Sequence, residues 1–130
     1  MQEYEVRDMA LAPSGHEKIN WVKKNMPLLA GLEKEFRQTK PFKDVKISLS
    51  VHLEAKTAYL CKVLAAGGAI MSVTGSNVLS TQDDVAAALV DDGLRVFAYH
   101  GATEEEYKRH IRKTLENGPQ IIIDDGGDLI

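Results

Sequence analysis

Beyond Pro41 the sequence alternates between short apolar segments and longer segments with helical periodicity, and this alternation constrains the fold more than any other feature. The strand-like segments are residues 45–51, 69–73, 94–99 and 120–123, and the helix-like segments between them are residues 55–66, 83–92 and 103–115. Strands that alternate with helices favour a parallel sheet with helices on both faces. The sequence therefore predicts an α/β fold with a Rossmann-like three-layer parallel sheet.

The order of the strands decides where a ligand would bind. Right-handed crossovers restrict the possible orders, and we expect the order 3-2-1-4, with 2-1-3-4 as the alternative. In open parallel sheets, ligands bind beyond the carboxyl ends of the strands, where the winding reverses. In the 3-2-1-4 order this reversal would place residues 52–57 across from residues 124–128, with the loop around Asn77 beside them.

The first 44 residues have a different pattern and predict a helical lead-in. Ser14 and Glu17 have the spacing of a capping box, and Pro27 separates two apolar stripes of helical period. We therefore divide the chain into a helical lead-in over residues 1–44 and a βαβαβαβ part over residues 45–130, which together form one domain.

Composition excludes several classes of function. The 130-residue chain has a formal net charge of −3, which argues against a nucleic-acid partner because such proteins are usually basic. No apolar run approaches the roughly 20 residues that cross a membrane. The single cysteine, Cys61, excludes an internal disulfide and suits a cytoplasmic location. No zinc-ligand spacing and no G-x-G-x-x-G turn occurs, so we expect this chain to bind neither a metal nor a dinucleotide.

Polar residues follow three of the four predicted strands, but taken alone most of them have structural explanations. His52 can be a hydrogen-bonded histidine at a helix start, and Glu54 and Lys56, two positions apart, point to different helix faces. Ser80 belongs to a helix-start signal. His110 falls on a polar helix face.

The acidic run at residues 124–128 is harder to explain by structure. Its two glycines permit close approach of the backbone to a ligand. Its carboxylates can accept hydrogen bonds from ribose hydroxyls or hold a hard cation, although the spacing of a calcium loop is absent. From the residues alone, the chain is an α/β domain with a polar crevice for a sugar-bearing small molecule.

Four motifs in these loops resemble the N-terminal part of the adenosylhomocysteinase family. They are VHLEAKTA at residues 51–58, SNVLSTQD at residues 76–83, VFAY at residues 96–99 and IDDGGDL at residues 123–129. The resemblance covers nearly the whole chain. It implies hydrolysis of S-adenosylhomocysteine to adenosine and homocysteine, through NAD-dependent oxidation of the ribose 3′-hydroxyl and β-elimination.

The resemblance also implies a role for individual residues. It makes His52 and Asp125 the catalytic candidates, with His52 beside the ribose and Asp125 supporting proton movement there. It places Glu54 and Lys56 against the purine, and has Asp128 brace the loop of Asp125. The substrate-binding set that it implies is His52, Glu54, Lys56, Thr57, Asn77, Ser80, Gln82, Asp125 and Asp128.

Two departures from the family pattern affect the prediction. Many members have Thr at the position of Glu54 and Glu at the position of Lys56, and the version in this chain resembles the archaeal and thermophile branch. A lysine donates and suits a 6-oxo group, so adenine and hypoxanthine both stay open as the base.

The second departure is length, because the resemblance stops at Ile130, before the NAD-binding domain of the family. We expect a part of the enzyme that is inactive alone, or alternatively a nucleoside-binding or interaction module without catalysis. The isoleucines at 121–123 would lie on an edge strand, which predicts a homo-oligomer.

Overall fold

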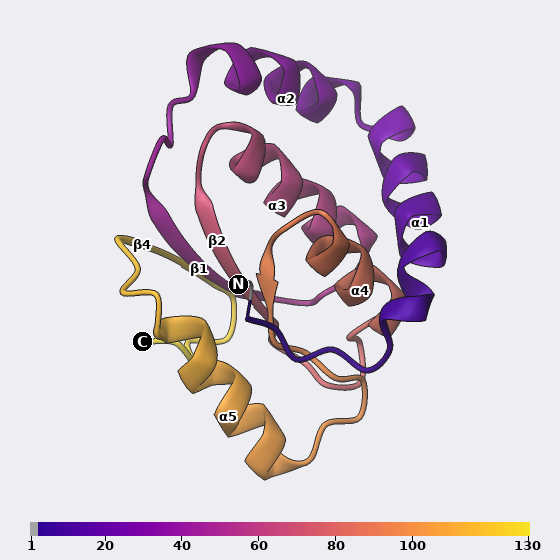
Figure 1. The fold of residues 1–130 in the computed structure, drawn as a ribbon, viewed down its shortest axis with the longest axis vertical. Helices are drawn as coiled ribbons and strands as arrows, with labels where there is room; N and C mark the ends of the chain where they lie inside the picture. The colour runs from indigo at the N-terminus through magenta and orange to yellow at the C-terminus, as the bar shows by residue number, and fades with distance from the viewer. Residues whose placement is uncertain (1–2) are drawn as a thin grey trace.

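A four-stranded parallel sheet lies at the centre of the structure, a computed structural model that describes residues 3–130 (Figure 1). Its strands are β1 (Lys46–Val51), β2 (Ile70–Gly75), β3 (Arg95–Val96) and β4 (Ile121–Asp124), and every pairing is parallel. The order is β3-β2-β1-β4, which confirms the predicted order 3-2-1-4 and makes the alternative 2-1-3-4 wrong.

Helices cover both faces of this sheet (Figure 1). They are α1 (Ala12–Asn25), α2 (Pro27–Thr39), α3 (Ala55–Ala66), α4 (Asp83–Asp91) and α5 (Glu104–Leu115), and a short 3₁₀ turn at Met9–Leu11 precedes α1. The α3 and α4 crossovers lie on one face, with α1 packed outside them, and α5 crosses the other face. Residues 1 and 2 of the predicted lead-in lie outside the described residues, and the division at residue 44 stays a prediction.

Both faces of β1 are buried, although its sequence alternates between apolar and polar residues. Ile47 and Leu49 belong to the apolar core with α3 and α4. Ser48 is also fully buried, and its hydroxyl donates 2.7 Å to the carbonyl oxygen of Thr114 at the end of α5. A small residue with a hydroxyl partner lets α5 approach the sheet closely, so the alternation here separates two buried faces rather than core from solvent.

The predicted capping box at Ser14 is wrong, because α1 begins two residues earlier with Pro13 in its first turn. Ser14 instead donates to the carboxylate of Asp84 on α4, with an oxygen–oxygen distance of 2.7 Å. The polar contact between the two helices therefore replaces the local cap. Thr103 and Glu106 form a complete capping box at the start of α5.

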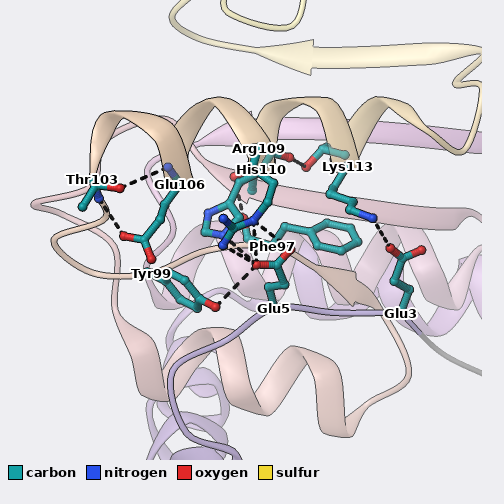
Figure 2. Close-up of polar contacts among 11 residues, drawn as sticks. Glu3, Glu5, Phe97, Tyr99, Thr103, Glu106, Arg109, His110 and Lys113 are labelled. Atoms are coloured by element: carbon teal, nitrogen blue, oxygen red, sulfur yellow. Dashed lines mark hydrogen bonds and ion pairs between the residues drawn. The ribbon is translucent and has the colours of Figure 1, made fainter.

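The N-terminal segment extends the sheet beyond β3 (Figure 2). The strand β3, predicted over residues 94–99, has only two residues. Glu5 forms a parallel bridge with Phe97, the residue that directly follows β3. The Glu5 carboxylate accepts bonds of 2.7 to 3.2 Å from Arg109 on α5. The segment is thus attached to the sheet and to α5 together.

His110 lies beneath this attachment and is only 1% exposed, so the prediction of a polar helix face is wrong. Its ring packs edge-on against Tyr99 with centroids 4.7 Å apart, and its Nε2 lies 3.6 Å from Glu5 Oε1 (Figure 2). Burial lowers the pKa of His110, although the charge of Glu5 opposes this. The covering segment comes from the far end of the sequence, so helical periodicity around residue 110 gave no sign of the burial.

Candidate functional site

The carboxyl ends of β1 and β4 bring the two predicted catalytic residues together. Ser50 on β1 is in register with Asp124 on β4, so His52 and Asp125 follow neighbouring strand ends. The Nε2 atom of His52 lies 3.9 Å from an Oδ2 oxygen of Asp125, and the two side chains are 52% and 40% exposed. The pair therefore faces open space at the edge of the sheet where winding reverses.

Ser80 orients the His52 ring. The Nδ1 atom of His52 lies 2.7 Å from Ser80 Oγ, and the Ser80 hydroxyl donates its one hydrogen to the Asn77 carbonyl at 3.2 Å. When the Ser80 hydroxyl donates to Asn77, its oxygen accepts from His52 Nδ1–H, and the Nε2 atom that faces Asp125 then carries the lone pair of a neutral ring.

Asp124, which belongs to the predicted acidic run but not to the predicted set of site residues, shapes the loop that carries Asp125. Its carboxylate accepts from the backbone N–H groups of Gly126, Gly127 and Leu129 at 2.7 to 3.0 Å. Burial acts to raise the pKa of Asp124, but these N–H groups outweigh it and hold the pKa below its usual range. An aspartate before two glycines is a known signal for such a side-chain turn, and it could have identified this residue.

Tyr107 on α5 is a second residue that the sequence did not identify. Its hydroxyl donates to the carboxylate of Asp128 and lies 3.3 Å from the Ser76 carbonyl oxygen. Burial and the Asp128 carboxylate raise the pKa of Tyr107. The Asp128 carboxylate and Asn77 line one hollow of about 450 Å³ with Tyr107, so the loops after β2 and β4 meet over α5.

Glu54 is the N-cap of α3, and its side chain is hydrogen-bonded to the first turn of that helix. Its carboxylate accepts from the backbone N–H of Lys56 at 3.1 Å and of Thr57 at 3.0 Å, and the Thr57 hydroxyl lies 3.3 Å from it. Thr57 is buried behind Glu54. Glu54 therefore acts as the helix cap, whereas the residue that we expected from the sequence at this helix start was His52, two positions earlier.

A second hollow, also of about 450 Å³, lies between α1 and the start of α3. Glu54, Lys56 and Gln82 line it together with Lys18 and Trp21 of α1. The nine predicted site residues thus fall into three places. They are the pair with its orienting residue (His52, Ser80, Asp125), the α1–α3 hollow (Glu54, Lys56, Gln82, with Thr57 behind) and the hollow over α5 (Asn77, Asp128).

Among residues 3–130, no group of three or more His, Cys, Asp or Glu side chains is placed to hold a metal ion. None of the helices formed by these residues has both the length and the apolar character needed to cross a membrane.

Comparison with known proteins gives consistent matches. The family described as S-adenosyl-L-homocysteine hydrolase matches residues 3–130. An S-inosyl-L-homocysteine hydrolase of Methanococcus maripaludis is 54% identical over 125 residues, which is 96% of this chain and 30% of the relative. An adenosylhomocysteinase of Pyrococcus abyssi is 50% identical over 128 residues, 98% of this chain and 30% of the relative. The chain therefore spans about 30% of the length of these curated relatives.

Proposed function

Because the chain belongs to the S-adenosyl-L-homocysteine hydrolase family, we propose that it supplies nucleoside-binding residues to a hydrolase of this kind. The reaction is the reversible hydrolysis of S-adenosylhomocysteine to adenosine and homocysteine. The relatives' names support a substrate in which a nucleoside is joined to homocysteine.

The spacing of His52 and Asp125 carries this proposal. At 3.9 Å their facing atoms are too far apart for a direct hydrogen bond. In the tautomer with Nδ1–H bonded to Ser80, both atoms accept, since Nε2 then carries a lone pair and Asp125 is a carboxylate. The vicinal hydroxyls of a ribose present two donors side by side, so one can bond to each acceptor. The Ser80 contact and the Asp124 turn hold these acceptors in place before a ligand arrives.

The same arrangement moves protons during the reaction. The free lone pair on His52 Nε2 takes a proton from a ribose hydroxyl, and the nearby Asp125 carboxylate stabilises the imidazolium that forms. Nδ1–H stays bonded to Ser80 and keeps the ring in its orientation. His52 and Asp125 are therefore the proposed catalytic residues.

We assign the redox part of the reaction to NAD, as the family resemblance implies. The residues of this chain do not fit that cofactor. The strand-to-helix connections after β1, β2 and β3 contain residues 52–54, 76–82 and 97–103, and none has the glycine spacing that holds a pyrophosphate. The proposed contribution of this chain is substrate binding and proton transfer, and the chain alone is expected to be inactive.

Calorimetric titration of the chain with adenosine tests the proposal. His52→Asn and Asp125→Asn should each weaken binding, because each removes one ribose acceptor. The matched controls are His16→Asn and Asp91→Asn, which break another His–Asp contact of 2.8 Å between α1 and α4. Equal affinity for the His52→Asn variant and its control would contradict the ribose site.

Turnover distinguishes this proposal from a module that binds without catalysis. We expect no release of homocysteine from S-adenosylhomocysteine by the chain with added NAD. Turnover under these conditions would overturn the assignment of the cofactor site to other parts of the enzyme.

Inosylhomocysteine is a second candidate substrate, which Lys56 favours. Its ammonium can donate to a 6-oxo group but cannot accept from the 6-amino group of adenine, and the relative from Methanococcus maripaludis is named for the inosyl compound. Inosine should then bind more tightly than adenosine, and Lys56→Met should remove the preference. Equal affinities for both nucleosides in the unmodified chain would exclude this candidate.

We also propose that the chain self-associates through the edge of β4 in the cytoplasm. Ile121 and Ile122 are 40% and 41% exposed on this outer strand, and unprotected edges pair with other chains. The buried free thiol of Cys61 supports a reducing compartment. A monomer in light scattering at high concentration would contradict the association.

A further inference from the structure

The chain's one tryptophan lies beside the α1–α3 hollow, and most of its side chain is exposed. Trp21 on α1 is 64% exposed, and its side chain lines the hollow opposite residues that begin α3. The helix α1 packs against α3 from the outer side of the helix layer on one face of the sheet (Figure 1). An indole ring that a fold leaves open at the wall of a concave surface is available to stack on a planar ligand.

Two of the other charged groups of the hollow, Lys18 and Glu54, are committed to partners, and the exposed Glu17 also lines it. Lys18 is 2.8 Å from the Asp84 carboxylate and donates to Gln82 at 3.2 Å. Glu54 is held by the backbone of α3. Within residues 3–130, the Lys56 ammonium has neither a hydrogen-bond nor an ion-pair partner. The hollow therefore offers an open aromatic surface and an unused cationic donor.

These two features match the chemistry of an oxo-substituted purine. Its flat ring suits an aromatic surface, and its carbonyl oxygen suits an ammonium donor. The hollow is also next to the proposed ribose site, because His52 precedes the helix cap Glu54 by two residues. A nucleoside bound at His52 can thus direct its base toward α1.

We propose that Trp21 stacks on the base of the bound nucleoside and strengthens its binding. This inference rests on the proposed function, because the ribose contacts of His52 and Asp125 place the base in the hollow. It assigns to α1, in the helical lead-in, a direct part in substrate recognition. The sequence motifs that indicated the site all lie after residue 50.

The single tryptophan makes the test direct, because the emission of the chain reports on position 21 alone. Inosine and adenosine are titrated into the 130-residue chain and followed by both calorimetry and emission, corrected for purine absorption. We expect quenching with the same midpoint as the heat signal. Trp21→Phe should keep most of the affinity, and Trp21→Leu should weaken binding by roughly 5- to 150-fold, the effect of losing one base–aromatic stack.

Tyr4→Leu is the matched control, since Tyr4 is a partly exposed aromatic residue outside both hollows. It should leave affinity unchanged. Binding without quenching, together with full affinity in Trp21→Leu, overturns the stacking inference and leaves the ribose site standing. An absence of heat with methyl riboside and with both nucleosides overturns the proposed function itself. Methyl riboside that binds without changing the emission supports separate ribose and base sites.

Discussion

Replacing Gly15 with alanine would force α1 away from α4. A Cβ atom at this position would lie 2.0 Å from the carbonyl oxygen of Asp84 and 2.8 Å from the Cβ of Ala88. Ordinary contact distances are about 3.5 to 4.0 Å, and the nearest obstacle is backbone that cannot rotate aside. The helices must therefore separate by about 1.5 Å at their closest point.

The magnitude of the loss follows from two opposing effects. Overpacking of this kind costs about 1–3 kcal/mol, and contact with rigid backbone places this case at the upper end. Alanine returns about 0.5–1 kcal/mol because glycine is a poor helix former. We expect a net loss of about 2 kcal/mol from the free energy of unfolding, a large share of the 5–15 kcal/mol of an ordinary domain.

Gly31→Ala in α2 is the matched control, because nothing lies within 4 Å of a Cβ atom there. The same substitution should then stabilise the chain by about 0.5–1 kcal/mol. Urea unfolding followed by circular dichroism measures both variants. A midpoint for Gly15→Ala at or above that of the unmodified chain would refute the reasoning about α1 and α4.

Three further predictions concern charge, the loop after β4 and the buried thiol. Burial acts to raise the pKa of Glu5, but the Arg109 contact outweighs it and keeps the pKa below 4.5. The ionised Glu5 therefore stabilises the fold above that pH, and this stabilisation is lost as the pH falls through the lower pKa of the folded state. Glu5→Gln should flatten the acid limb of a stability–pH curve, and an unchanged limb would count against the contact. Asp124→Ala should destabilise the chain by about 1 kcal/mol or more and speed amide hydrogen exchange in residues 126–129, whereas unchanged exchange would show that the turn holds without its acceptor. Cys61 is fully buried and burial raises the pKa of its thiol to about 12, so thiol reagents should modify it only at the rate of unfolding, measured against urea concentration.

Local sequence patterns were sufficient to predict the fold class, because they showed which segments must bury an apolar face. The alternation of strand-like and helix-like segments after residue 44 predicted the parallel sheet, and crossover handedness left two strand orders, of which the structure has the favoured one. Where a long-range contact competes with a local signal, the prediction was wrong. Ser14 bonds to α4 rather than to the start of its own helix.

The candidate site was predictable only as a set of residues at the strand ends. Sequence placed His52 and Asp125 after adjoining strands, and the structure brings their side chains within 3.9 Å. It did not indicate that Glu54 caps α3, although the helix was expected to begin at residue 55, because glutamate is not among the residues preferred at that position. Nor did it indicate Tyr107, which reaches Asp128 only because α5 crosses beneath two loops.

The sequence by itself determined the parallel sheet and the strand ends at which polar residues gather, since these follow from periodicity and chain connectivity, and the structure decided between the two strand orders that it left open. Tertiary structure alone decided which polar groups are already occupied and which stay free for a ligand. Glu54 and Lys18 have partners, whereas the Nε2 side of the His52 ring and the open ring of Trp21 face space. Hydrogen bonds and packing between residues distant in sequence depend on three-dimensional proximity, which no local pattern records.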